Sequence, residues 1–163
     1  MALKYKKILY CTDFSEDADY AFLTALDMAR KYRAQLYIFH VVHSPYKYIR
    51  NVVDEQVGKG EEAFISREII EKGTKELKER YEPKTGAFTN YEFHLTGGVP
   101  FVEIVRFALA QGVDCIVLGA VGNSDLDRTT FGSTAENVAR RAHCTVMAIR
   151  YPGKSFQLDT LGK

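Results

Sequence analysis

Glycine and hydroxyl residues in the C-terminal third of the chain have the types and spacing needed to bind a phosphate group. Gly119 and Gly122 follow an apolar run, and after nine intervening residues Gly132, Ser133 and Thr134 begin a helical pattern. A helix N-terminus carries unpaired N–H groups and the positive end of the helix dipole, which both favour an anion. Glycine lets an anion approach the backbone where a Cβ atom would block it. The pattern predicts a phosphate site between a strand end and a helix start.

Strand-like and helix-like segments alternate along the chain and decide where these glycines lie. Apolar runs predict the strands, and apolar residues three and four positions apart predict the helices. The predicted strands cover residues 5–12, 35–42, 89–95, 113–118 and 144–150, and the predicted helices cover residues 15–33, 61–81, 100–111 and 133–143. This order predicts a single α/β domain whose parallel sheet has helices on both faces.

Local signals set the ends of the helices. Ser15 is predicted to cap the first helix, Pro100 occupies the first position of the third helix, and Gly112 ends that helix. Residues 82–86, which read Glu-Pro-Lys-Thr-Gly, are predicted to end the second helix at residue 81. Residues 43–60 have no clean period and are predicted to be a polar connection.

The glycine pattern resembles the nucleotide-binding signature of the universal stress protein (UspA) family. Three further segments are similar to that family in order and spacing: the first strand with Asp13 and Ser15 at its end, the second strand end at residues 39–42, and the Gly98-Val99-Pro100 start of the third helix. The similarity runs from about residue 6 to residue 150. It therefore covers nearly the whole chain.

The resemblance implies a three-layer α/β/α, Rossmann-like domain of the adenine nucleotide alpha hydrolase type over residues 1–150, followed by a tail at residues 151–163. Together with right-handed crossovers, it implies a five-stranded parallel sheet of order 3-2-1-4-5. Ligands bind such sheets outside the carboxyl ends of the strands, where the strand order reverses. That switch point lies between the first and fourth strands, whose ends carry Asp13 and Gly119.

The resemblance also implies which residues contact an adenine nucleotide. Thr12 and Asp13 end the first strand, and Val41 ends the second, where the family binds the base edge through backbone groups. The neighbouring His40 is expected to be structural. The ligand is expected to be ATP, with AMP and ADP as alternatives, and Asp13 is a candidate ligand for Mg²⁺. The expected nucleotide-binding residues are Thr12, Asp13, Val41, Gly119, Gly122, Gly132, Ser133 and Thr134.

Structural roles compete with these interpretations. Asp13 can instead form an Asx turn before the first helix. Gly119 and Gly122 can simply permit a tight turn after the fourth strand. Ser133 and Glu136 have the spacing of a capping box, so Ser133 can cap the fourth helix while other N–H groups remain for phosphate.

Signals for catalysis are weaker. In the loop at residues 123–131, Asp125 and Asp127 can hold Mg²⁺ and Arg128 can reach a γ-phosphate, but a solvated loop surface is the simpler interpretation. No Walker lysine is present, so moderate affinity is expected. No general base can be named. The chain is therefore expected to be a stress-response protein that binds ATP mainly as a conformational or assembly ligand. The alternatives are a slow Mg²⁺-dependent ATPase and an interaction module without nucleotide.

Composition limits the partners. The 22 basic and 21 acidic residues balance, which gives no basic surface for nucleic acid or an anionic membrane. The apolar runs are shorter than the roughly 20 residues that span a bilayer, so a cytoplasmic protein is expected. Cys11, Cys115 and Cys144 have no metal-ligand spacing and are expected to be small buried apolar residues.

The last predicted strand, residues 144–150, is apolar and lies at the edge of the predicted sheet. Exposed apolar edges tend to be paired or covered. The resemblance implies a homodimer formed through this strand. The alternative is that the tail from Tyr151 covers the edge within one chain.

Overall fold

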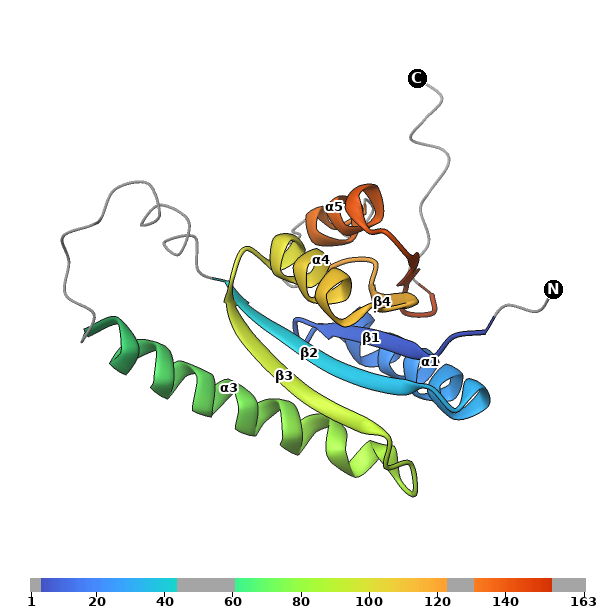
Figure 1. The fold of residues 1–163 in the computed structure, drawn as a ribbon, viewed down its shortest axis with the longest axis horizontal. Helices are drawn as coiled ribbons and strands as arrows, with labels where there is room; N and C mark the ends of the chain where they lie inside the picture. Colours follow the sequence, from blue (N-terminus) through green and yellow to red (C-terminus); the bar gives the residue numbers. More distant parts are fainter. Residues whose placement is uncertain (1–3, 44–60, 123–130, 154–163) are drawn as a thin grey trace.

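Five parallel strands in the order β3-β2-β1-β4-β5 form the centre of the structure (Figure 1). They are β1 (Lys7–Thr12), β2 (Gln35–His43), β3 (Tyr91–Gly98), β4 (Cys115–Gly119) and β5 (Thr145–Ile149). The structure is a computed structural model and describes residues 4–43, 61–122 and 131–153. The predicted strand order is confirmed, and the order reverses between β1 and β4.

Helices cover both faces of this sheet, which confirms the predicted layers. They are α1 (Glu16–Tyr32), α3 (Glu61–Thr85), α4 (Pro100–Gln111) and α5 (Ser133–Arg141). Successive strand residues point to opposite faces, so Tyr10 packs with α1 and α3 while Leu9 packs with α4 and α5. Both side chains are fully buried, as expected for strands covered on both faces.

The predicted helix ends at α1 and α4 are confirmed. The Ser15 hydroxyl accepts the N–H of Ala18 at 3.2 Å and so caps α1. Pro100 opens α4, and Gly112 ends it in the left-handed region with φ 62°. Glycine adopts this conformation without the steric cost that a side chain would add.

The predicted end of the second helix is wrong. α3 continues through Pro83 to Thr85, and two contacts stabilise its last turn. Arg30 of α1 donates to the Thr85 carbonyl at 2.7 Å, and the Thr85 hydroxyl donates to the carbonyl of Glu82 at 2.8 Å. The helix therefore ends just before Gly86, which has a φ of 57°. Tertiary contacts thus outweigh the local cost of a proline.

β3 begins and ends later than its predicted bounds of 89 and 95. Tyr91 pairs with Leu36, and the pairing continues to Gly98 opposite His43. Glycine has a low intrinsic preference for strands, so the sequence pattern ends too early. Hydrogen bonding to β2 extends β3 through both of its glycines.

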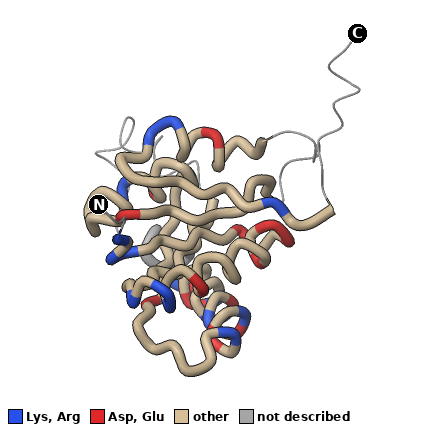
Figure 2. Tube along the Cα trace, turned by 90° about the vertical axis from the view of Figure 1, so that its right-hand side faces the viewer, with Lys and Arg blue, Asp and Glu red and all other residues tan. Residues whose placement is uncertain are grey.

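Charged residues are spread over the structure. In the view of Figure 2, basic and acidic residues are interspersed along the helices. None of the described helices combines the length and the apolar character needed to cross a bilayer. The predicted connection at residues 44–60 and the loop carrying Asp125, Asp127 and Arg128 lie outside the described residues.

Gly119, the last residue of β4, lies directly against α1. A Cβ atom at this position would lie 2.8 Å from the Ala18 nitrogen and 3.0 Å from the carbonyl carbon of Asp17. Both are backbone atoms of the first turn of α1, so the helix itself would have to move. Close packing between helix and strand therefore explains this glycine independently of any ligand.

We predict that Gly119→Ala lowers the free energy of unfolding by about 1–3 kcal/mol, because the added methyl group overpacks the contact with α1. Urea unfolding without ligand measures this change. Gly97→Ala is the matched control, since its Cβ atom would lie 3.8 Å from the Val42 carbonyl oxygen, an ordinary contact. Equal unfolding midpoints for the two variants would show that α1 tolerates a side chain at position 119.

Candidate functional site

A cleft of about 630 Å³ opens where β1 and β4 separate. The last paired residues of these strands are Cys11 and Leu118, and both line the cleft. It lies at the carboxyl ends of the strands and at the switch point, where ligands bind in folds of this kind. Its volume falls within the range of about 300–1,000 Å³ found for small-molecule sites.

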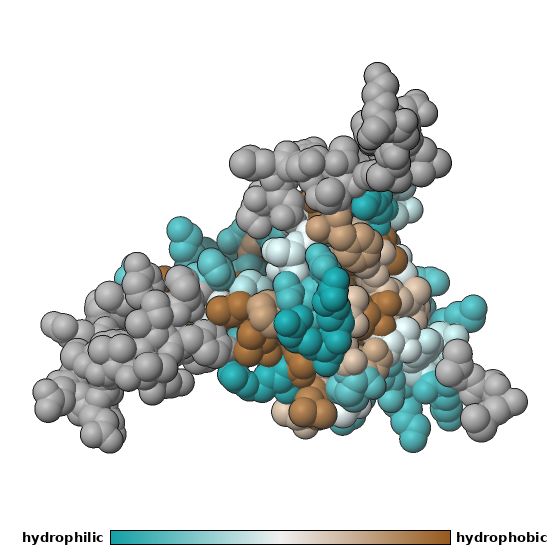
Figure 3. Space-filling model, turned by 90° about the horizontal axis from the view of Figure 1, so that it is seen from above, coloured by the Kyte–Doolittle hydropathy of each residue, from teal (hydrophilic) through white to brown (hydrophobic). Residues whose placement is uncertain are grey.

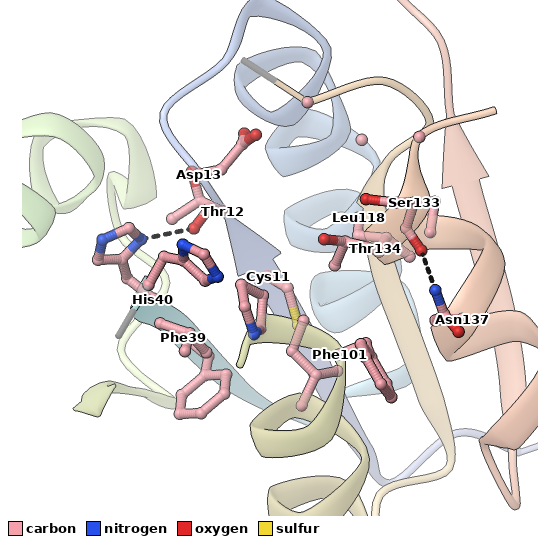
Figure 4. A pocket seen from close by; sticks show the side chains of 18 of the residues that line it. Cys11, Thr12, Asp13, Phe39, His40, Phe101, Leu118, Ser133, Thr134 and Asn137 are labelled. Carbon is pink, nitrogen blue, oxygen red and sulfur yellow. Dashed lines mark hydrogen bonds between the residues drawn. The ribbon is translucent and has the colours of Figure 1, made fainter. Parts of the chain in front are cut away.

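Polar residues face one another across this cleft. Thr12 and Asp13 at the end of β1 lie on one side, and Ser133 and Thr134 at the start of α5 lie on the other (Figure 4). All the residues predicted to bind nucleotide line this one cleft: Thr12, Asp13, Val41, Gly119, Gly122, Gly132, Ser133 and Thr134. Their individual roles toward a ligand stay predictions.

Side-chain hydrogen bonds fix the backbone conformation of the turn from β1 into α1. The Asp13 carboxylate accepts the Ser15 N–H at 3.0 Å, so the Asx-turn interaction is present while Asp13 also lines the cleft. Thr12 Oγ1 accepts the Phe14 N–H at 2.9 Å. Phe14 has a φ of 62°, a left-handed conformation that costs a residue with a side chain about 1–2 kcal/mol. Surrounding contacts must therefore hold this turn in place.

His40 supports the same turn and also lines the cleft. Its Nδ1 lies 2.7 Å from the Thr12 carbonyl oxygen. Because a carbonyl oxygen can only accept, Nδ1 carries the hydrogen and donates it. The His40 ring also packs against the Phe14 ring, with 4.4 Å between the ring centroids. The structural role predicted for His40 is confirmed.

The N-terminus of α5 differs from the predicted capping box. Gly132 is the N-cap residue, no side chain caps the helix, and Ser133 is the first helical residue. In addition, the Gly132 N–H donates to the Ala120 carbonyl at 2.8 Å and is not available to a phosphate, contrary to the expectation. Within the described residues, the first-turn N–H groups left without an intrahelical partner are those of Ser133, Thr134 and Ala135. The chain leaving β4 thus sets the position of the helix end.

The charges at the cleft are few. Among the described residues that line it, Asp13 is the only acid, and there is no lysine or arginine. His40 and His43 also line the cleft. In the described part of the chain, no three His, Cys, Asp or Glu side chains are grouped as a metal site. Within this described lining, an anion would be bound mainly by backbone N–H groups and hydroxyls.

The apolar wall of the cleft was not predicted from the sequence. Phe39 and Phe101 lie low in the view of Figure 4, and Leu118 lines the cleft closer to Thr134. The sequence pattern at these residues indicated only a strand or the inward face of a helix. Cys11 also lines the cleft, and burial raises the pKa of its thiol well above the ordinary value. The prediction of a small buried residue is confirmed at Cys11 and Cys115, whereas Cys144 is only half-buried.

A group of polar residues behind the turn, in which Tyr10, Tyr81 and Thr12 are buried and Asp19 and Arg80 are partly exposed, was also missed. Tyr81 of α3 contacts Thr12, Tyr10 and Asp19 through its hydroxyl, and Arg80 pairs with Asp19. The sequence signal was only a tyrosine on the apolar face of a helix, where phenylalanine would pack equally well.

Comparison with known proteins identifies close similarity over almost the whole chain. The model of the "Universal stress protein family" matches residues 4–150. Universal stress protein MJ0531 of Methanocaldococcus jannaschii is 32% identical over 151 residues, covering 92% of this chain and 85% of the relative. Universal stress protein MJ0577 of the same organism is 30% identical over 159 residues, covering 92% of this chain and 98% of the relative.

Solved structures agree with the sequence comparison. A structure described as hypothetical protein MJ0577 superposes with a TM-score of 0.76 at 25% identity, covering 93% of this chain and 99% of that one. UspA from Lactobacillus plantarum gives a TM-score of 0.61 at 26% identity, covering 91% of this chain and 100% of that one. The family match and the structural superpositions support one conclusion: this chain belongs to the universal stress protein family.

Proposed function

We propose that the cleft binds an adenine nucleotide, ATP in particular, and that the nucleotide acts mainly as a conformational or assembly ligand in a stress response. The observation that carries this proposal is the first turn of α5, whose remaining N–H groups lie across the cleft from Thr12 and Asp13. Two solved family members support the choice of ligand, because one is described in complex with cAMP and the other, from Archaeoglobus fulgidus, in complex with dAMP.

The apolar part of the cleft suits the base. Phe39 and Phe101 offer aromatic surface, and Val41 lies beside them on β2. The pairing of β2 with β1 ends at His40, whereas its pairing with β3 continues to His43. The β1-facing backbone edge of Val41 therefore lies past the end of β1, where it can bind the edge of a base as the family resemblance implies.

The start of α5 suits the phosphates. Hydrogen bonds to a charged group are worth about 1.5–3 kcal/mol each, and a helix N-terminus contributes about 0.3–2 kcal/mol more. Several such bonds and a buried base reach roughly 8 kcal/mol, which corresponds to a micromolar dissociation constant. Because these donors belong to the backbone, the site needs no lysine or arginine side chain.

We predict that Ser133→Pro weakens ATP binding by about 10- to 100-fold, because proline removes the Ser133 N–H and with it one bond to a phosphate. The substitution fits the backbone. Position 133 is the first residue of α5, where proline is favoured, and Gly132 already has the extended conformation (φ −64°, ψ 146°) that precedes a proline. Isothermal titration calorimetry with Mg²⁺ measures the loss.

Ser133→Ala is the matched control, because it removes the hydroxyl and keeps the N–H group. Its affinity should lie much closer to that of the unaltered protein, and both variants should unfold near the unaltered midpoint. If the alanine variant loses as much affinity as the proline variant, the hydroxyl rather than the amide binds the ligand. If neither loses affinity, α5 does not bind the phosphates.

We predict that Mg²⁺ strengthens ATP binding far more than AMP binding. The described lining offers no lysine or arginine to neutralise a triphosphate, and the Asp13 carboxylate would repel it without a cation. Titrations of both nucleotides with Mg²⁺ and with EDTA measure the difference. The same ratio of affinities for ATP and AMP under both conditions would contradict this role for Mg²⁺.

We also propose that β5 forms a homodimer interface. β5 is an edge strand that pairs only with β4 within the described sheet. Tyr151, two residues after the end of β5, is held by α1, because its N–H donates to Asp17 at 3.2 Å and its ring packs on Tyr20. Figure 3 views the molecule from the side of α5 and shows apolar residues on both sides of a hydrophilic strip. The surface in this view is therefore mixed rather than uniformly polar.

We predict that sedimentation equilibrium at micromolar concentration gives twice the chain mass of 18.5 kDa. Unpaired edges of sheets tend to pair with another chain, and here the partner would be a second copy. A mass of one chain across the concentration range would contradict the dimer and would leave the nucleotide proposal intact.

A further inference from the structure

The turn that carries Thr12 and Asp13 into the cleft is held from behind by α3. Arg80 Nη2 donates to the Phe14 carbonyl at 3.0 Å. The Tyr81 hydroxyl lies 2.6 Å from Thr12 Oγ1, and Thr12 Oγ1 in turn accepts the Phe14 N–H. Through these contacts α3 fixes both backbone polar groups of the left-handed residue Phe14.

The hydrogen bonds that join Thr12, Tyr81 and Asp19 have only one possible order of donors and acceptors. Asp19 Oδ1, as a carboxylate oxygen, accepts from Tyr81 Oη at 2.8 Å and from Arg80 Nε at 2.9 Å. The single Tyr81 proton is used there, so Thr12 must donate its own proton to Tyr81. The result is a directed chain from the Phe14 N–H through Thr12 and Tyr81 to Asp19, in which each bond polarises the next.

Asp19, the last acceptor in this series of hydrogen bonds, is charged. Burial by itself raises the pKa of Asp19, but the hydrogen bonds from Arg80 and Tyr81 outweigh this effect and hold the pKa below its ordinary value. The carboxylate therefore accepts hydrogen bonds throughout the neutral range. Tyr81 is fully buried, so water cannot replace its hydroxyl at Thr12.

We propose that Tyr81 is a positioning residue of the nucleotide site: its hydroxyl holds the Thr12 side chain, and thereby the turn that presents Asp13 and the Thr12 carbonyl at the cleft. This inference rests on the proposed nucleotide function. Tyr81 itself does not line the cleft. Without its hydroxyl, the Thr12 proton lacks its acceptor, and a rotated Thr12 releases the Phe14 N–H that keeps the backbone left-handed.

His40 should also respond when Tyr81 no longer holds the turn. It donates through Nδ1 to the carbonyl of Thr12 and packs on Phe14, so it depends on the turn in two ways. When the turn relaxes, the hydrogen on Nδ1 is no longer fixed and the ring samples both neutral tautomers. The ¹⁵N chemical shifts of the His40 ring therefore measure the turn without any nucleotide.

Tyr10 supplies a matched control for Tyr81. Both rings are fully buried, and their hydroxyls lie 3.1 Å apart in the same group. The Tyr10 hydroxyl, however, donates its one proton to the Ala18 carbonyl at 2.7 Å, so Thr12 receives no proton from it. Removing it leaves the chain from Thr12 through Tyr81 to Asp19 in place.

We predict that Tyr81→Phe weakens binding of Mg²⁺-ATP about tenfold, the size of one net hydrogen bond, whereas Tyr10→Phe binds within twofold of the unaltered protein. Titration calorimetry measures both affinities, and circular dichroism checks that both variants are folded. The His40 ring shifts should change in Tyr81→Phe and stay unchanged in Tyr10→Phe.

Equal affinities in the two variants, with unchanged His40 shifts, would overturn the positioning role while leaving nucleotide binding established. If the unaltered protein binds no adenine nucleotide, the proposed function fails. The His40 shifts then decide separately whether Tyr81 holds the turn, and shifts that respond equally to both substitutions would overturn that role.

Discussion

The separation of β1 and β4 is the constraint on which the rest of the structure depends. The two strands pair up to Cys11 and Leu118, after which the chain leaves β1 toward α1 on one face and leads from β4 toward α5 on the other. Parallel strands joined by right-handed crossovers produce such a divergence wherever the strand order reverses. The cleft is the space between the two departing segments, so its existence follows from topology rather than from any single side chain.

Two kinds of interaction then act at different levels. Burial of apolar residues on both faces of the sheet stabilises the fold, but this force has no direction and tolerates substitution of one apolar residue by another. The turn at residues 12–15 instead depends on directed hydrogen bonds, because Phe14 adopts a conformation that its own sequence disfavours. Bonds from Thr12, Arg80 and the buried Tyr81 offset that cost. The packed core thus determines where the site lies, and a few polar contacts determine its shape.

The proposed use of backbone donors would also allow a family to diverge widely in sequence. The first turn of α5 presents N–H groups whatever side chains it carries, provided that Gly132 and the preceding strand place the helix end correctly. The solved structure of MJ0577 has a similar fold, with a TM-score of 0.76, at 25% identity. Such a site would be altered less by replacing a side chain than by moving a helix.

The sequence by itself determined the order of the elements, the parallel sheet and the glycines and polar residues that meet at the cleft. These features follow from hydrophobic periodicity, from turn residues and from the family pattern, which are all encoded over short stretches. Tertiary structure alone decided that α3 continues through Pro83, that Gly132 rather than Ser133 caps α5, and that Gly119 is required by the packing of α1. It alone joined Tyr81 to Thr12, 69 positions apart. These outcomes depend on which groups from distant segments meet in space, and no local pattern records such a meeting.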